Sequence, residues 1–188
     1  MPLEKPAPIE TGRLRVRLVE EADLPALFEV NGDAEVTRFL PYATWESPAS
    51  GNAWYQRMMD LQATGTALQF VVVDKAAGRA IGTCLLFRHD VASARAELGF
   101  VLARKHWGGG YMSEALAALI DCAFGRMGMR RLEAEANPGN VASGRLLRRL
   151  GFVREGLARE RWVSKGTPHD VESYGLLRRD WEGRRPAA

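Results

Sequence analysis

One stretch of the chain combines residues that can bind a phosphate with a carboxylate close by. Residues 97–111 read E-L-G-F-V-L-A-R-K-H-W-G-G-G-Y, which places a glutamate in an apolar run before a basic turn and three glycines. Glycines let a ligand approach the backbone closely, and N–H groups in the first turn of a helix lack partners within that helix. Because the helix dipole also favours negative charge there, the sequence predicts a phosphate-bearing ligand at residues 108–112.

Two common phosphate-binding motifs do not fully match this stretch. A P-loop requires G-x-x-x-x-G-K-[ST], and no segment of the sequence has that order. A dinucleotide fingerprint requires G-x-G-x-x-G after the first strand of a βαβ unit, whereas Ser113 replaces the third glycine here and the motif follows the fourth expected strand. Glu133 is spaced to mimic the ribose-binding acid of that fingerprint, so a dinucleotide remains the weaker alternative.

Hydrophobic periodicity predicts the elements that must position this stretch. Alternating apolar and polar residues indicate strands, and apolar residues three or four apart indicate helices. The expected strands are 13–19, 68–74, 81–88, 94–103, 131–136, 152–163 and 170–177, and the expected helices are 23–30, 50–62, 111–127 and 140–150. We expect Asp23 and Asn140 to cap their helices, residues 1–12 to form a loose leader and residues 182–188 a tail. The order predicts a single mixed α/β domain over residues 13–181.

Composition excludes several functional classes. The chain has 188 residues, 46% of them hydrophobic, with no apolar run near the roughly 20 residues that cross a bilayer. The net charge is +3, and acids are interleaved with the basic residues, which argues against a nucleic-acid partner. Cys84 and Cys122 lie in apolar segments, which favours buried free thiols and a cytoplasmic setting. With three histidines and no C-x-x-C pair, we expect no metal site. The lack of a long apolar run likewise predicts no membrane partner.

An aromatic loop supplies candidate acceptor-binding residues. Residues 39–48 read F-L-P-Y-A-T-W-E-S-P, with three aromatic residues between two prolines. Binding residues concentrate on loops, so Tyr42 and Trp45 are predicted to line a substrate groove. The alternative is that they plug the edge of the core. Exposed aromatic residues would also favour self-association, so the sequence leaves both a monomer and a homodimer open.

Four motifs in a fixed order resemble a known family. They are E-L-G-F at 97–100, W-G-G-G-Y-M-S-E-A at 107–115, N-V-A-S at 140–143 and L-R-R-L-G-F at 147–152. Together they resemble the GNAT superfamily of N-acetyltransferases, and within it the RimJ/RimL type that acetylates the N-termini of ribosomal proteins. The resemblance covers roughly residues 11–181, with Arg13 and Leu14 also placed where that branch has similar residues.

The resemblance implies a fold and a cofactor. The fold is a central, mostly antiparallel mixed sheet of about seven strands, splayed between the fourth and fifth and flanked by four helices. Acetyl-CoA is expected with its pyrophosphate on the main chain of residues 105–110 and its pantetheine arm on the strand backbone before them. The cofactor-binding residues would be Phe100, Val101, Leu102, Lys105, His106, Trp107, Gly108, Gly109, Gly110, Tyr111, Met112, Asn137, Asn140, Ser143 and Leu146.

Acetyl transfer to an amine requires a proton acceptor, a polarised thioester carbonyl and a stabilised thiolate. Glu97 is the candidate base, because a carboxylate among apolar neighbours has a raised pKa. The alternative is a structural acid paired with an arginine. Ser143 resembles the serine proposed as general acid in RimL-like enzymes, although a local backbone contact would also explain it. Trp162 stands where RimL-type enzymes carry a glutamate, so their acid–base pair is incomplete here.

The predicted activity is an acetyl-CoA-dependent N-acetyltransferase that works by direct attack in a ternary complex, without an acyl-enzyme. An α-amino group, with a pKa near 8, is partly neutral at pH 7, whereas a lysine amine near 10.4 is not. A protein or peptide N-terminus is therefore the expected acceptor, selected by Leu40, Tyr42, Trp45 and Trp162. Two alternatives stay open: acetylation of a small-molecule amine, and a non-catalytic module that binds acyl-CoA.

Overall fold

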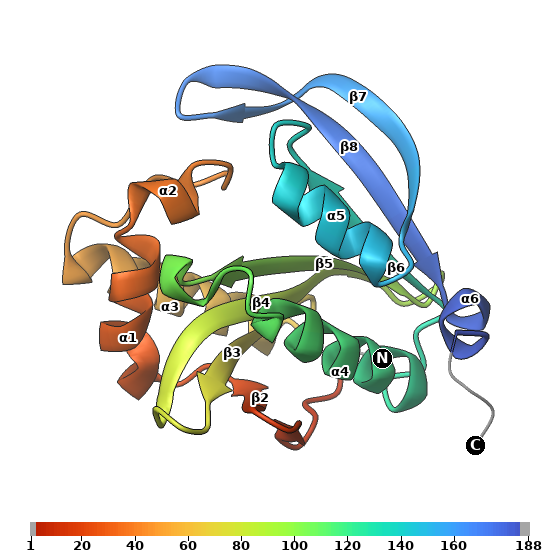
Figure 1. The fold of residues 1–188 in the computed structure, drawn as a ribbon, viewed down its shortest axis with the longest axis horizontal. Coiled ribbons are helices and arrows are strands. Elements are labelled where there is room, and N and C mark those ends of the chain that lie inside the picture. The colour runs from red at the N-terminus through yellow and green to blue at the C-terminus, as the bar shows by residue number, and fades with distance from the viewer. Residues whose placement is uncertain (1–2, 185–188) are drawn as a thin grey trace.

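The computed structural model describes residues 3–184, which form one eight-stranded sheet in the order β1-β2-β3-β4-β5-β6-β8-β7 with helices on both faces (Figure 1). The strands are β1 (Ile9–Glu10), β2 (Leu14–Leu18), β3 (Leu68–Asp74), β4 (Arg79–Asp90), β5 (Arg95–Leu102), β6 (Arg131–Ala136), β7 (Val153–Ser164) and β8 (Thr167–Leu177). The helices are α1 (Leu24–Asn31), α2 (Ala34–Thr37), α3 (Pro48–Ala63), α4 (Tyr111–Gly125), α5 (Val141–Arg149) and α6 (Arg178–Glu182). The mixed α/β class is confirmed, with one strand and two helices more than the sequence predicts.

The sheet opens between β5 and β6, as the sequence analysis predicts for its fourth and fifth strands. These two strands run parallel and pair only from Arg95 opposite Arg131 to Glu97 opposite Glu133. Beyond that point both strands continue without pairing to each other, β5 to Leu102 and β6 to Ala136. In Figure 1 the β7–β8 ribbon accordingly rises away from β3 and β4. The sheet therefore offers unpaired strand backbone at its centre.

Two cores cover the two faces of the sheet. The larger core packs α4 and α5 against residues such as Ala96 and Leu98 of β5. The smaller core packs α1 and α3 against Val71 of β3. Because side chains alternate along a strand, Glu97 points to the face opposite α4, on the α1 side. The period-two pattern of β5 thus decides which face carries the carboxylate.

The N-terminal segment differs from its prediction as a loose leader. Leu3 is buried in the larger core, and its N–H donates to the Gly65 carbonyl. Ile9 and Glu10 pair with β2 as a short edge strand. The prediction was wrong because short segments carry little periodicity, although they still gain stability by packing on an existing sheet. Of the predicted tail, residues 185–188 lie outside the described residues.

Asp23 does not cap a helix in the predicted way. It ends a short 3-10 turn before α1, where its carboxylate accepts hydrogen bonds from the Glu20 N–H at 2.9 Å and from Arg17 at 2.8 Å. Asn140 does cap α5: its Oδ1 accepts from the Ser143 N–H at 3.1 Å. No helix in the part of the chain that the structure describes is long and apolar enough to cross a membrane.

Candidate active site

The three glycines after β5 form a backbone cradle at the N-terminus of α4. Gly108 and Gly110 have φ angles of 74° and 76°, a left-handed conformation that side chains disfavour. At Gly109 an added Cβ would lie 2.9 Å from the Tyr111 ring. Gly110 is the N-cap, and among the described residues no side chain caps the helix. The first-turn N–H groups are therefore directed at an anion-binding position, which fits a pyrophosphate.

Arg13 and Glu114 fix this glycine loop. Arg13 Nη1 donates to the Gly109 carbonyl at 2.9 Å, and Arg13 Nε donates to Glu114 Oε2 at 2.7 Å. The guanidinium also lies 4.2 Å above the Tyr111 ring. Thr11 completes the arrangement by donating to Glu114 Oε1 at 2.6 Å. The sequence analysis noted Arg13 only as a match to the family, because this contact spans about a hundred residues of chain.

The residues between β5 and the glycines lie beside the cradle. Lys105 and His106 belong to a short 3-10 helix, and the His106 ring packs edge-on against Tyr111 at 5.2 Å. Burial lowers the pKa of His106 below its usual value. The Trp107 indole donates to the Leu102 carbonyl at 2.8 Å, so this predicted pantetheine acceptor is already hydrogen-bonded.

Four predicted cofactor residues lie in the turn and helix that follow β6: Asn137, Asn140, Ser143 and Leu146. The Asn137 side chain accepts from the Gly139 N–H at 2.8 Å, which holds the turn after β6. The Asn140 carbonyl oxygen is engaged in the helix cap, and Leu146 packs on the larger core. The structure thus shows local roles for both asparagines, and a contact with the cofactor stays a prediction.

Glu97 lies at the last paired position of β5, where the two strands separate. It is only 6% exposed, and its Oε2 accepts a hydrogen bond from Arg88 Nη1 at 2.7 Å. Burial raises the pKa of Glu97 above its usual value, and the arginine opposes this shift without cancelling it. Glu97 therefore pairs with an arginine, as the structural alternative predicts. It also has the raised pKa that a general base requires.

The aromatic loop divides between the core and the surface. Trp45 is 5% exposed, and its ring lies 5.5 Å from that of Trp54 in the smaller core. The predicted groove residue Trp45 is therefore a core plug, because the loop folds back on α3. Tyr42 donates to Asn31 Oδ1 at 2.9 Å and lines, with Trp45, a cavity of about 250 Å³ against α3.

We expect Trp45→Ala to lower the free energy of unfolding by about 3–5 kcal/mol, the cost of emptying a large aromatic site in a core. Trp107→Ala is the matched control, since Trp107 is 51% exposed and should cost only about 1 kcal/mol for one hydrogen bond. Urea unfolding followed by circular dichroism measures both variants. Equal losses would contradict the core assignment of Trp45.

Leu40 is the predicted substrate residue that approaches the hairpin of Trp162. The Leu40 carbonyl accepts from Ser164 Oγ at 3.0 Å, and the Thr37 carbonyl accepts from Lys165 Nζ at 2.9 Å. Figure 1 shows the loop after α2 close to the tip of the β7–β8 hairpin. Segments more than a hundred residues apart thus meet. No local pattern predicts α2 or this contact.

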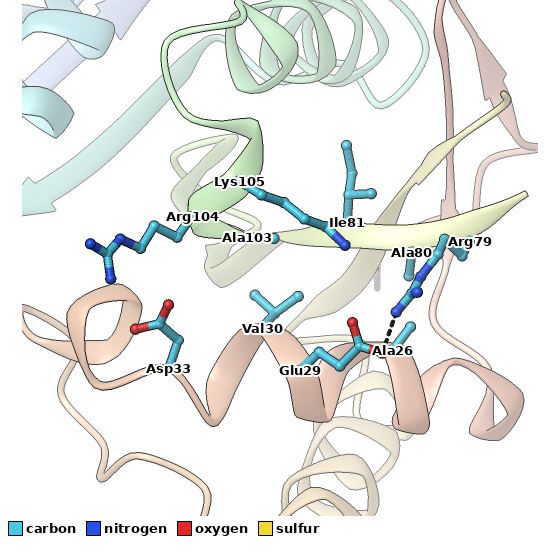
Figure 2. Close-up of a pocket in the computed structure, with 10 residues that line it drawn as sticks. All are labelled: Ala26, Glu29, Val30, Asp33, Arg79, Ala80, Ile81, Ala103, Arg104 and Lys105. Carbon is cyan, nitrogen blue, oxygen red and sulfur yellow. Dashed lines mark ion pairs between the residues drawn. The ribbon is translucent and has the colours of Figure 1, made fainter. Parts of the chain in front are cut away.

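A cavity of about 510 Å³ lies between α1, the start of β4 and the 3-10 helix (Figure 2). Figure 2 shows Arg79 and Glu29 pointing toward one another, and their ion pair measures 2.6 Å. Lys105 is the one predicted site residue in its lining. The lining mixes both charge signs with apolar side chains, so it lacks the anion-selective chemistry of the glycine cradle.

Comparison with known proteins identifies the family and the fold of the chain. The model of the acetyltransferase (GNAT) domain matches residues 13–153. The chain belongs to the GNAT acetyltransferase family. It is 36% identical to "Uncharacterized N-acetyltransferase p20" of Bacillus licheniformis, over 92% of this chain and 97% of that protein. It is 31% identical to the [ribosomal protein uS5]-alanine N-acetyltransferase of Escherichia coli, over 92% of both chains.

A solved GNAT structure gives the same fold with the cofactor present. RimL, the ribosomal L7/L12 alpha-N-protein acetyltransferase in complex with coenzyme A, superposes with a TM-score of 0.82 at 23% identity. The superposition covers 91% of this chain and 98% of RimL. As a GNAT enzyme, the protein is an N-acetyltransferase that uses acetyl-CoA as its acyl donor.

Within this GNAT domain, Arg13→Ala should weaken acetyl-CoA binding by about 5- to 20-fold, because the loop loses a charge-assisted contact that orders its N–H groups. Arg15→Ala is the matched control on the same strand, where Arg15 bonds only to Glu10 in the described contacts. Titration calorimetry measures both dissociation constants. A similar loss in both variants would point to a general charge effect instead of loop ordering.

Proposed function

We propose that the protein transfers the acetyl group to the α-amino group of a protein or peptide N-terminus. The observation that carries the proposal is the buried carboxylate of Glu97 at the point where β5 and β6 separate. The relative that acts on the alanine of ribosomal protein uS5 supports the same acceptor class. A carboxylate base with a raised pKa suits an α-amino group better than a lysine, because the α-amino group holds its proton less tightly.

The mechanism needs two proton movements. Acetyl-CoA supplies a thioester whose carbonyl carbon bonds to the amine nitrogen as its carbon–sulfur bond breaks. Glu97 takes one proton from the ammonium group of the acceptor, which leaves a neutral amine. A β5 backbone N–H that faces the opening polarises the carbonyl oxygen; the predicted Val101 N–H does not fit this role, because the register turns it toward Thr83 of β4. The Ser143 hydroxyl passes the second amine proton to the departing sulfur. The products are an amide and a free thiol, and Glu97 returns its proton to solvent.

Direct attack is supported by the state of the cysteines. Cys84 and Cys122 are both buried free thiols, and burial raises the pKa of each thiol above its usual value. A thiol that resists ionisation is a poor nucleophile. The acetyl group therefore passes to the acceptor without a cysteine-bound intermediate.

A small-molecule amine is the second candidate acceptor. Ser164 and Lys165 donate to the carbonyls of Leu40 and Thr37, and we infer that this link between two segments with predicted substrate residues limits the space for a peptide. A panel of acceptors separates the two: peptides beginning with alanine, serine or methionine, the same peptides with blocked N-termini, spermidine and free amino acids. Free thiol release and mass spectrometry of the products give rate and position.

We expect turnover of free N-termini and none of blocked ones. Turnover of spermidine alone would move the acceptor to a small amine. Tight acetyl-CoA binding without turnover of any amine would favour a binding module and contradict the proposed function.

The proposal also covers the oligomeric state of the protein and its location in the cell. The predicted aromatic surface is smaller than expected because Trp45 is buried, but the edge strand β7 exposes Val153, Leu157 and Val163. We propose a cytoplasmic homodimer, which sedimentation velocity tests. Interleaved acids and bases argue against nucleic acid as a partner, so any affinity for it should be weak at every salt concentration.

A further inference from the structure

The backbone of Arg88 is held in an unusual conformation beside the opening of the sheet. Its φ angle is 50°, at an irregularity in the β4–β5 pairing between Phe87 and Asp90. Residues other than glycine adopt left-handed angles only at a cost, and bulges redirect side chains. Such strain persists where the surrounding structure enforces it and gathers at active sites. The bulge of β4 thus places this arginine beside Glu97.

A single nitrogen of Arg88 lies near two carboxylates. Nη1 is 2.7 Å from Glu97 Oε2 and 3.7 Å from Glu135 Oε2. Glu97 pairs with Glu133, and Glu135 follows two residues later on β6, so all three side chains share one face. Beyond the last paired residues, Glu135 borders the opening. A cationic nitrogen therefore lies between one acid on β5 and one on β6.

Glu135 lacks a hydrogen-bond donor. The side chain is only 15% exposed, and its Oε2 is buried and accepts no hydrogen bond from any described residue. The nearest contact to its other oxygen is Arg161 Nε at 3.7 Å, which is too long for a hydrogen bond. Buried carboxylate oxygens are normally paired. This oxygen is thus available to a donor on a ligand.

The Arg88 guanidinium can move away from the two carboxylates, whereas the Glu97 side chain is held in place. The Arg88 side chain is 54% exposed, while Glu97 and Glu135 are held in the sheet. The Phe87 ring lies 5.5 Å from the guanidinium and provides an aromatic wall that suits a cation. Gly99, between Glu97 and Val101 on the same face, carries no side chain there. An added Cβ at Gly99 would lie 3.7 Å from the Phe87 ring, so this ring borders the backbone between the acids and the expected thioester position.

We propose that the Arg88 guanidinium occupies the position of the acceptor's ammonium group, between the carboxylates of Glu97 and Glu135, and that the acceptor displaces it. This inference rests on the proposed function and names Glu135 as a specificity-determining residue. An ammonium group has three donors, enough for both carboxylates. Its proton moves along the hydrogen bond to Glu97, which becomes a neutral acid and leaves a neutral amine. The site therefore takes primary amines that are cationic at neutral pH.

Burial and charge around Glu97 agree with this step. Arg88 faces it from β4, and Glu133 and Glu135 face it from β6. When Arg88 moves out, the two acids oppose the charge on Glu97, which favours transfer of a proton to it. Displacement of Arg88 by the acceptor would thus make Glu97 a stronger base at the moment when the ammonium group binds.

Steady-state kinetics of three variants test the inference. Arg88→Gly keeps the left-handed backbone and removes the internal cation, so the amine KM should fall by about 2- to 5-fold, the effect of one partly exposed ion pair. Arg88→Lys keeps a cation and should retain the wild-type KM. Glu135→Gln should raise the amine KM by about 10-fold with a smaller change in kcat. Acetyl-CoA affinity should stay unchanged in all three. Arg95→Ala, which removes a neighbouring cation paired with Asp90 and Glu133, is the control.

A binding measurement separates this inference from the proposed function. Methylguanidinium should bind Arg88→Gly in calorimetry and compete with the amine but not with acetyl-CoA, while wild type binds it at least several-fold more weakly. A raised amine KM in Arg88→Gly, or absence of methylguanidinium binding to it, would overturn the inference. If methylguanidinium binds Arg88→Gly while wild type acetylates no amine, the proposed function fails and the cation position stands.

Discussion

Gly110→Val is expected to weaken acetyl-CoA binding by about 100-fold, because the loss of one or two hydrogen bonds to a charged phosphate costs about 1.5–3 kcal/mol each. Gly110 has a φ of 76° and precedes the first residue of α4. A valine there is strained in any left-handed conformation, so the backbone moves and its N–H groups turn from the anion position. An added Cβ would lie 3.6 Å from Arg13 Nη2, an ordinary contact, so the expected effect comes from the backbone.

Gly78→Val is the matched control for this variant. Gly78 has a φ of 63° in the β3–β4 turn, with nothing within 4 Å of an added Cβ. The backbone penalty should be similar at both positions, about 1–2 kcal/mol in the free energy of unfolding. Calorimetry with acetyl-CoA and thermal unfolding of both variants separate binding from stability. Wild-type affinity in Gly110→Val would contradict the assignment of the cradle.

Glu97→Gln is expected to lower kcat/KM for the amine by about 100- to 1000-fold, the usual contribution of a general base. The amide has nearly the shape of the carboxylate and can still accept a hydrogen bond from Arg88, but it cannot take a proton. In wild type, kcat/KM should rise with pH through the raised pKa of Glu97. This rise is the acid limb of the pH–rate profile. It should disappear in the variant, and measuring kcat/KM over a range of pH values tests this.

Glu133→Gln is the matched control, since Glu133 lies on the same face and pairs instead with Arg95 and Arg131. It should keep the acid limb of the profile. An unchanged rate in Glu97→Gln would assign this carboxylate a structural role only.

The raised pKa of Glu97 also predicts a pH dependence of stability. The folded protein holds its proton above the ordinary value of 4.5, where the unfolded chain has released it. Stability contributed by the neutral acid is therefore present below 4.5 and is lost as the pH rises to the folded pKa. Glu97→Gln, which is always neutral, should show a smaller loss over that window in urea unfolding at a series of pH values.

Local sequence signals predicted the parts of the site that depend on neighbouring residues. Gly108 and Gly110 need conformations that other residues disfavour, so their position marks the cradle directly. The Asn140 cap and the apolar face of α4 follow from spacing within one helix, and the structure confirms both elements. The strands β3 to β6 were placed within a few residues for the same reason.

Long-range contacts could not be read from such signals. The short strand β1 and helix α2 form because they pack on elements already present. Trp45 has the same local sequence whether it lines a groove or plugs a core, and only the fold of its loop against Trp54 decides between them. The contact of Arg13 with Glu114 depends on β2 lying beside α4.

By itself, the sequence determined the family, and it led to the predictions of a phosphate cradle and of Glu97 as the base, because these depend on residue types at fixed short spacings. Only the tertiary structure decided what surrounds Glu97. The register of β5 against β6 brings Glu135 to the same face, and the bulge in β4 turns Arg88 between the two acids. Register and bulges arise from pairing between distant strands, so the partners of a catalytic carboxylate become visible only when the sheet is assembled.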